Sequence, residues 1–397
     1  MIRGDWIATW TASPMNVWAA DMVIPGFYNQ TVREIARISV GGRRLRIRVS
    51  NEFGSAPIVI NAAHVALAGE DGAIQPLTSR PLTFGGEATA SIAPGAPLFS
   101  DPVELATPAL SRLALSFYVS GHLPVETHHY EAQQTAFISI PGNFAASELL
   151  PLQQTTTSRY FASAIYVDAK EGSRAIACFG DSITDGYGSQ IDGDRRWPDI
   201  LSERLSAGTA TQDLAVINLG IGGNRLLSNR RGTKALERFD RDVLSLPRVS
   251  HLIILEGVND IGWPNTALAG ADEAVTAKQI ISAIRQLAVR AETAGIRVIL
   301  GTLTPFEGTT SESPVGDFYT PEKEKVRGAV NAWIERPRAF TALSTLMPPF
   351  AIPAGQPGFS QPMIAAITST RATQATGPWR KPSTWPCSNR RTISKSL

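Results

Sequence analysis

The stretch "RAIACFGDSITDG", residues 174–186, joins a short apolar run to a polar turn. Near-continuous apolar runs of this length are typical of parallel strands that are buried on both faces. The run ends at Gly180, and an acid and a serine follow it directly. Because functional groups of open parallel sheets gather at the carboxyl ends of strands, the stretch predicts a buried strand whose end presents Ser182. Cys178 is expected to be a small core residue of that strand.

Further strand-like and helix-like segments follow along the chain. The runs "DLAVINLG" (213–220), "HLIILEGV" (251–258) and "IRVILGTL" (296–303) are mostly apolar. A helical period covers 271–294, and a second helix is expected from Thr320, a cap residue followed by proline, to about Glu335. Alternating strands and helices predict an α/β domain over 174–335, built on a doubly wound, flavodoxin-like parallel sheet.

The chain before this region has a different pattern. "LRIRVS" (45–50) alternates apolar and polar residues, and 56–67 and 112–119 are further strand-like segments between turn residues. Residues 1–165 are therefore predicted to form an all-β, jelly-roll-like sandwich domain. We expect residues 131–163 to cross from this domain to the next.

Composition excludes several functions. The net charge of the 397 residues is only +2, which argues against a nucleic-acid partner. No apolar run is long enough to span a membrane. The start lacks a signal-peptide core, which predicts a cytoplasmic protein, or a secreted one if the true start lies upstream. Two cysteines make no disulfide framework. No cluster has metal-ligand spacing, and no Lys-Ser/Thr follows "GIGG" as in a phosphate-binding loop, so no cofactor is expected.

Polar, glycine-containing patches follow three successive strands of the predicted sheet. They are "GDSITDG" at 180–186, "NLGIGGNR" at 218–225 and "EGVND" at 256–260. Parallel strands end at the same sheet edge, so these patches are expected to meet. Asp181, Asp185 and Asp260 are interpreted as turn-fixing residues, because short carboxylates accept local backbone N–H bonds.

The three patches resemble the first three conserved blocks of the SGNH, or GDSL, hydrolase family. Residues 1–165 also resemble the β-domain that precedes this fold in one subgroup of esterases and lipases. The resemblance implies a serine esterase or lipase that cleaves small-molecule or carbohydrate acyl esters through an acyl-serine intermediate. It implies Ser182 as the nucleophile, and an oxyanion hole formed by the backbone N–H groups of Ser182 and Gly223 and the side-chain amide of Asn259.

The implied roles agree with elementary chemistry. Ester cleavage develops negative charge on the carbonyl oxygen, and preorganised N–H donors stabilise that charge. Glycine at 223 lets the backbone approach a substrate closely, because glycine has no Cβ.

The base that activates Ser182 is missing from the expected place. The family supplies it from a D-x-x-H block near the C-terminus, whereas the five histidines here are His64, His122, His128, His129 and His251. Four of them lie in residues 1–165, which we call the β-region. His251 opens a strand at the end of the sheet away from Ser182. We expect none of them to serve Ser182, which predicts an enzyme impaired as written.

The last 62 residues, 336–397, contain eight Lys or Arg and no Asp, Glu or His. The coding DNA of residues 366–388 can be read one base out of register, with the bases that the protein sequence does not fix chosen freely. It can then encode DHLHPSDAGYRAMAEAIDLALL, which contains a D-x-x-H block. The stretch from Ala339 can encode a string close to VHGVVDFDAAVRDPGRP. The hypothesis is a frameshift near 334–339, which leaves the α/β domain incomplete and 336–397 as an aberrant, poorly ordered tail; a basic nucleic-acid arm is the competing interpretation.

A non-catalytic alternative stays open at this point. Trp6, Trp10 and Trp18 of the β-region could offer aromatic platforms to sugars, in a carbohydrate-binding protein or pseudoenzyme. Tryptophan is also a common core residue, and its position in the fold decides between the two roles.

Overall fold

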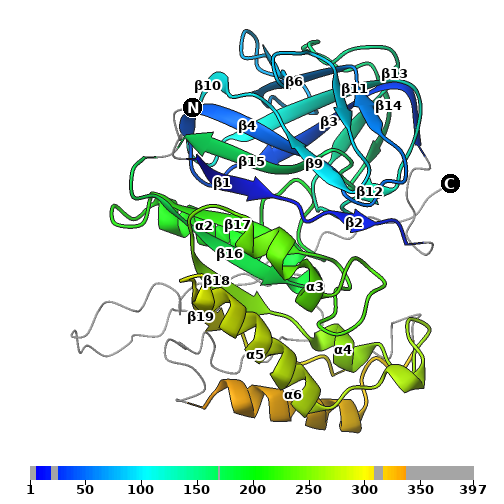
Figure 1. The fold of residues 1–397 in the computed structure, drawn as a ribbon, viewed down its shortest axis with the longest axis vertical. Helices are drawn as coiled ribbons and strands as arrows, with labels where there is room; N and C mark the ends of the chain where they lie inside the picture. Colours follow the sequence, from blue (N-terminus) through cyan, green and yellow to red (C-terminus); the bar gives the residue numbers. More distant parts are fainter. Residues whose placement is uncertain (1–5, 19–25, 169, 308–315, 337–397) are drawn as a thin grey trace, which may run out of the picture.

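The computed structural model describes residues 6–18, 26–168, 170–307 and 316–336. The described residues up to 168 contain strands and no helix, whereas strands and helices alternate from 174 onward (Figure 1). The strand-rich first part and the parallel strands of the second part agree with the predicted fold, whereas the domain bounds stay a prediction. No helix among these residues has the length and apolar character that a membrane crossing requires.

Two antiparallel sheets make up most of the first part. One has the order β1-β15-β4-β10, with β9 also paired to β4, and the other has the order β14-β13-β3-β11-β6-β7. The strands of this part are β1 (Trp6–Thr11), β2 (Met15–Asn16), β3 (Gly26–Arg37), β4 (Gly42–Asn51), β5 (Ile58–Ile60), β6 (Ala62–Leu67), β7 (Arg80–Pro81), β8 (Ala90–Ile92), β9 (Ala96–Phe99), β10 (Val103–Thr107), β11 (Arg112–Pro124), β12 (Thr127–His128), β13 (Ala136–Pro141), β14 (Leu152–Thr156) and β15 (Ala162–Asp168).

One boundary prediction is wrong. Residues 131–163 do not form a crossing segment, because β13, β14 and the start of β15 lie within them and pair inside the two antiparallel sheets. The chain passes to the α/β part only after β15.

The second part contains a parallel sheet with the order β17-β16-β18-β19. Its elements are β16 (Arg174–Gly180), α1 (Ser182–Asp185), α2 (Trp197–Ser206), β17 (Leu214–Gly220), α3 (Ala235–Phe239), the π-helical turn η1 (Asp240–Leu244), β18 (Val249–Leu255), α4 (Val258–Gly262), the 3-10 turn η2 (Ala271–Glu273), α5 (Ala277–Thr293), β19 (Arg297–Leu300) and α6 (Pro321–Ile334). The doubly wound, flavodoxin-like and jelly-roll-like classes stay predictions.

Alternate residues of β16 belong to different apolar clusters. Ile176 and Cys178 pack with α2 through Trp197 and its apolar neighbours. Phe179 instead lies in the cluster that contains the buried face of α5 and touches Phe239 edge-on. Cys178 is fully buried, so its predicted core role is confirmed.

Helix α5 begins later than the sequence pattern predicts. Residues 271–273 form a separate 3-10 turn, and the helix starts at Ala277. Thr276 and Gln279 form a capping box, in which each side chain binds the other residue's backbone N–H. The predicted helix from Thr320 is confirmed, because α6 starts at Pro321 with Thr320 accepting a hydrogen bond from the Lys323 N–H.

The β-region covers the β17 edge of the parallel sheet. The Val216 N–H donates to Ser39 Oγ at 3.1 Å, and the Asn218 carbonyl accepts from Thr11 Oγ1 at 2.6 Å. These side chains satisfy backbone groups that an edge strand otherwise leaves unpaired. Strand β1 lies along this boundary in Figure 1, directly above β17 and β16.

Candidate active site

Ser182 occupies the turn that the sequence predicts. Strand β16 ends at Gly180, Asp181 caps the single helical turn α1, and its carboxylate accepts the Ile183 N–H at 2.9 Å. Ser182 is the first residue of α1 and is half-buried. The turn ends at Gly186, which has a φ of 109° and leaves no room for a Cβ against Arg196. The interpretation of Asp181 as a turn-fixing residue is confirmed.

The strand register brings the three polar patches to one edge. Gly180 of β16 lies opposite Gly220 of β17 and Leu255 of β18. The Ile221 N–H donates to the Gly180 carbonyl at 3.1 Å, so the second patch starts against the end of the first strand. A Cβ on Gly220 would lie 2.2 Å from the backbone nitrogen of Asp185, so α1 packs directly on the end of β17.

Gly223 lies in the loop after β17 and Asn259 lies in the short helix α4 after β18, and the two segments are hydrogen-bonded to each other. The Asn259 Nδ2 donates to the backbone carbonyl of Asn224 at 2.9 Å, one residue beyond Gly223. An amide nitrogen carries two N–H donors, and this bond uses one of them. Gly223 has a φ of 76°, and a Cβ there would lie 2.8 Å from both Arg231 and Trp263. The position therefore requires glycine for its backbone conformation and for space.

Ser182 is linked to these segments through Asp185, at the other end of α1. The Gly222 N–H donates to Asp185 Oδ2 at 3.1 Å. The structure thus joins Gly223 and Asn259 through Asn224, and joins the Ser182 turn to the same glycine loop through Asp185. Asp260 binds the next part of this loop, because its carboxylate accepts the N–H groups of Leu226 and Leu227. Asp185 and Asp260 thus accept backbone N–H bonds, but from the loop after β17 rather than from their own turns, so their interpretation as local turn-fixing residues is not confirmed.

A buried arginine that sequence reasoning missed holds the strand ends together. Arg238 Nη2 donates to the Gly180 carbonyl at 3.0 Å, and its Nη1 donates to the Leu219 carbonyl at 2.8 Å. Its Nε donates to Asn224 Oδ1 at 2.9 Å, and Asp242 balances its charge at 2.9 Å. In the sequence, Arg238 is only an arginine in a short helical segment. Nothing in that pattern distinguishes a buried arginine from one on the surface.

Three buried carboxyl groups surround Arg238 and the loop starts. Burial raises the pKa of Asp181 from 3.8 to about 7 and that of Asp260 from 3.8 to about 6. Burial also raises the pKa of Glu256 well above its usual range, and the neighbouring charge of Asp181 adds to this shift. Glu256 lies 3.9 Å from Arg238. Burial thus disfavours the charged form of all three acids, although a group with a pKa of about 6, such as Asp260, is still mostly ionised at neutral pH.

His129 contacts the α/β part, but both of its ring nitrogens face acceptors. Nδ1 lies 2.9 Å from the Ser13 carbonyl and Nε2 lies 3.0 Å from Asp185 Oδ1. Both ring nitrogens of His129 are thus engaged with acceptors other than the Ser182 hydroxyl. Sequence reasoning missed this pairing between the two parts of the chain.

The other histidines have surroundings away from Ser182. His64 contacts Ser79, and His122 lies on β11 opposite Tyr28. His128 packs near Tyr130, and burial lowers its pKa to about 4. His251 pairs with Ile176, four residues before the end of β16, so it lies toward the opposite sheet edge, as predicted.

The frameshift hypothesis concerns residues 336–397. Of these, only Arg336 is among the described residues. The predictions of an aberrant, poorly ordered segment and of a lost D-x-x-H block therefore stay predictions.

Only one of the three tryptophans singled out in the β-region lies near the candidate site. Trp10 is buried beneath Arg159, and Arg46 lies 4.5 Å from the centre of the Trp6 ring. Trp18 stacks on Trp263, whose ring also borders Gly223. Trp6 and Trp10 are thus placed as packing residues.

Within the ranges that the structure describes, no group of three or more His, Cys, Asp or Glu is arranged to hold a metal ion. The groups gathered at the sheet edge are a serine, backbone N–H donors and a neutral amide. That set can stabilise a developing oxyanion.

Comparison with known proteins finds similar solved structures. No curated protein matches the chain. Among solved structures, the acetyl xylan esterase AlAXEase is 21% identical over 40% of this chain and 71% of that chain, with a TM-score of 0.30. Axe2, an acetylxylan esterase from Geobacillus stearothermophilus, is 20% identical over 41% and 72%, with a TM-score of 0.31. A GDSL-like lipase from Bacteroides thetaiotaomicron VPI-5482 is 21% identical over 41% and 64%, with a TM-score of 0.28.

The sequence model of the GDSL-like lipase/acylhydrolase family matches residues 178–352. This match begins in β16, just before the Ser182 turn, and includes Gly223 and Asn259. Residues 178–352 thus match a GDSL-like lipase/acylhydrolase domain, and through them the chain is similar to this family of ester hydrolases.

Proposed function

We propose that Ser182 is the nucleophile of a serine esterase that works through an acyl-serine intermediate. The N–H groups of Ser182 and Gly223 and the Nδ2 of Asn259 form its oxyanion hole. The observation that carries the proposal is the hydrogen bond from Asn259 Nδ2 to the Asn224 carbonyl, which fixes a neutral donor beside Gly223 at the sheet edge where Ser182 lies.

The reaction has two steps. The Ser182 hydroxyl attacks the ester carbonyl, its proton passes to a base, and negative charge develops on the carbonyl oxygen. Preorganised donors stabilise that charge. The tetrahedral intermediate collapses with release of the alcohol, and a water molecule then cleaves the acyl-serine to give the carboxylic acid and free Ser182.

We further propose that the chain as written is impaired, because the base is missing. His129 is engaged through both ring nitrogens, and His251 lies toward the opposite sheet edge. Losing the base costs several orders of magnitude in rate. We propose that water takes the Ser182 proton in the slow reaction that remains, so that this reaction still passes through Ser182. A frameshift near 334–339 accounts for the loss, and sequencing the gene across these codons tests it. An uninterrupted written frame would end the frameshift hypothesis.

The substrate class proposed is a small-molecule or carbohydrate acyl ester. In fold terms we propose an all-β, jelly-roll-like domain over 1–165 and a doubly wound α/β hydrolase domain over 174–335. Helix α2 and helix α5 pack with apolar side chains from alternate positions of β16, which supports helices on both sheet faces.

The test is hydrolysis of p-nitrophenyl acetate by the full chain and by Ser182→Ala. We expect slow hydrolysis that the substitution removes. Ser206→Ala is the matched control, because Ser206 ends α2 near the opposite edge of the sheet, and it should keep the wild-type rate. Equal rates for wild type and Ser182→Ala contradict the nucleophile. A rate typical of intact serine esterases contradicts the impairment.

A non-catalytic carbohydrate-binding protein is the second candidate. Trp18 and Trp263 near Gly223 are the aromatic residues that it would use, although their stacking covers one face of each ring and Arg231 and Arg225 lie over the rings. Retention of the full chain on a polysaccharide column, together with no difference in hydrolysis between wild type and Ser182→Ala, would favour this candidate over the esterase.

A further inference from the structure

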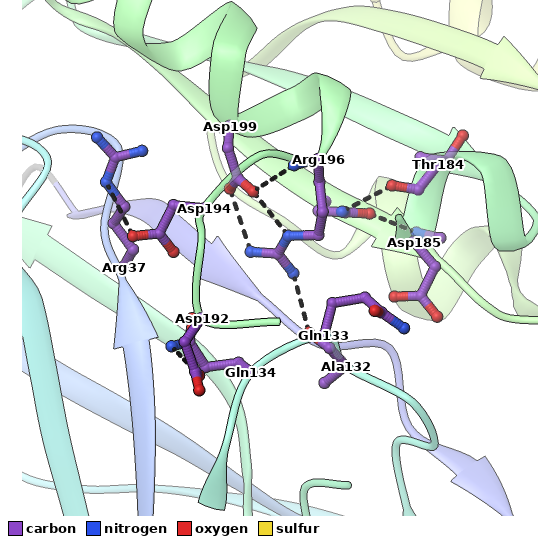
Figure 2. Close-up of polar contacts among 12 residues, drawn as sticks. Arg37, Ala132, Gln133, Gln134, Thr184, Asp185, Asp192, Asp194, Arg196 and Asp199 are labelled. Atoms are coloured by element: carbon purple, nitrogen blue, oxygen red, sulfur yellow. Dashed lines mark hydrogen bonds and ion pairs between the residues drawn. The ribbon is translucent and has the colours of Figure 1, made fainter. Parts of the chain in front are cut away.

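A short segment of the β-region runs along the α/β part. We call residues 129–135 the clasp. At its far end the Gln133 carbonyl accepts the Asp192 N–H at 3.1 Å. The Asp192 carboxylate accepts hydrogen bonds from Gln134 Nε2 at 2.9 Å and from the N–H and hydroxyl of Thr135 at 2.7 and 2.6 Å. Figure 2 shows this end, with Gln133 and Gln134 next to Asp192 and with Asp185 on a neighbouring segment.

The near end of the clasp contacts the candidate site itself. His129 Nε2 lies 3.0 Å from Asp185 Oδ1, and both side chains are almost fully buried. The other carboxylate oxygen of Asp185 accepts the Gly222 N–H at 3.1 Å. The Ser13 carbonyl, also in the β-region, fixes the far nitrogen of the ring at 2.9 Å.

The Asp185 carboxylate therefore connects three parts of the protein. It contacts the β-region through His129, it ends the helical turn that Ser182 begins, and it binds the residue next to Gly223. If the imidazole is removed, a buried carboxylate loses its partner, which is costly enough to make the carboxylate move toward water. That movement would release the Gly222 N–H and loosen the loop.

We infer that His129 is a positioning residue for ester hydrolysis. Acting through Asp185, it fixes the position of the Gly222-Gly223 loop relative to the Ser182 turn. The β-region thereby becomes part of the catalytic unit. This inference rests on the proposed function of Ser182 and Gly223. The positioning role of His129 differs from a contact that only joins the two parts of the chain. The hydrogen bond between Gln134 and Asp192 is of that second kind, because it does not involve the Gly222-Gly223 loop.

The test combines two measurements on the full chain. Hydrogen exchange followed by NMR reports the Gly222 amide, and p-nitrophenyl acetate hydrolysis, corrected for the Ser182→Ala rate, gives kcat and KM. In His129→Ala we expect Gly222 exchange to accelerate about tenfold or more. We expect kcat to fall about 10-fold to 100-fold with KM changed less than about twofold, because small misplacements of reacting groups are costly.

Three further variants make the outcome specific. His129→Gln should restore part of both signals, because its Nε2 can donate to Asp185. Asp185→Asn should accelerate Gly222 exchange even if His129→Ala fails to fold. Gln134→Ala, the matched control in the same clasp, should leave Gly222 exchange and kcat unchanged. Exchange in β3 and β11 reports whether each variant is folded.

The outcomes separate the two proposals. Unchanged Gly222 exchange in folded His129→Ala and Asp185→Asn overturns the positioning role, and so does an equal effect of Gln134→Ala. A wild type without Ser182-dependent hydrolysis contradicts the proposed function instead, while Gly222 exchange still shows whether His129 holds the loop.

Discussion

The side chain of Asn259 donates a hydrogen bond of 2.9 Å to the backbone carbonyl of Asn224. The loop after β17 and the short helix α4 after β18 are thereby held together at the edge of the parallel sheet. A donor fixed before the reaction starts costs no reorganisation when charge develops on the substrate.

Replacing Asn259 by alanine should lower the Ser182-dependent kcat for p-nitrophenyl acetate about 10²-fold to 10³-fold, the usual cost of one oxyanion donor. KM should change little, because the donor acts mainly on the transition state. Steady-state kinetics, with the Ser182→Ala rate subtracted, measure both constants. A kcat within twofold of wild type would remove Asn259 from the oxyanion hole.

Gly223 and Gly188 form a matched pair for a glycine test. Both have a left-handed φ, 76° and 79°, but an added Cβ meets Arg231 and Trp263 at Gly223 and meets no atom within 4 Å at Gly188. Gly188→Ala should cost only the backbone strain, about 1 kcal/mol of unfolding free energy. Gly223→Ala should cost more and should also reduce kcat. Urea denaturation and kinetics compare the two, and equal losses would contradict the close packing around Gly223.

Removing the charge of Arg238 should destabilise the fold. Arg238→Met leaves two strand-end carbonyls without their buried donor, while Asp242 keeps Arg241 as a partner, at an expected cost of about 2–5 kcal/mol. Arg290→Met is the control, because its ion pair with Asp240 is partly exposed, and it should cost about 1 kcal/mol or less. Urea denaturation midpoints measure both. Similar shifts in the two variants would show that Arg238 does not hold the strand ends.

The parallel strands could be predicted from sequence because their apolar runs carry the signal locally. The polar segments after β16, β17 and β18 could be predicted because a glycine or an acid follows the apolar run of each strand. Arg238 and the pair of His129 and Asp185 could not be predicted, because their partners lie far along the chain: 58 residues separate Arg238 from Gly180, and 56 separate His129 from Asp185.

The two boundary errors have local causes. Ala271, Asp272 and Glu273 resemble the acidic first turn of a helix, but the capping box of Thr276 and Gln279 sets the start of α5. Strand β14 is polar and lies at the edge of its sheet, where apolar patterning is weak, whereas the mostly apolar sequence of β13 is compatible with a strand.

The buried acids predict a pH dependence of stability. Burial raises the pKa of Asp181 from 3.8 to about 7, so the folded protein holds this proton more tightly than the unfolded chain does. Between about pH 4 and 7 the folded state thus binds more protons, and the free energy of unfolding falls as pH rises through this window. Asp181→Asn can still cap α1 but cannot ionise. Its stability should decline less than that of wild type between pH 4 and 7.5 in urea denaturation; parallel pH profiles would contradict the raised pKa.

The acyl-serine itself is the most direct test of the account. The full chain is incubated with p-nitrophenyl acetate, quenched in acid and digested with trypsin, which should release residues 175–195 as one peptide between Arg174 and Arg195. Fragment masses should place an acetyl group on Ser182 in wild type, absent from Ser182→Ala and formed about 10²-fold more slowly in Asn259→Ala. An acetyl group on other residues only, at a rate that neither substitution changes, would contradict Ser182 as the nucleophile of this site.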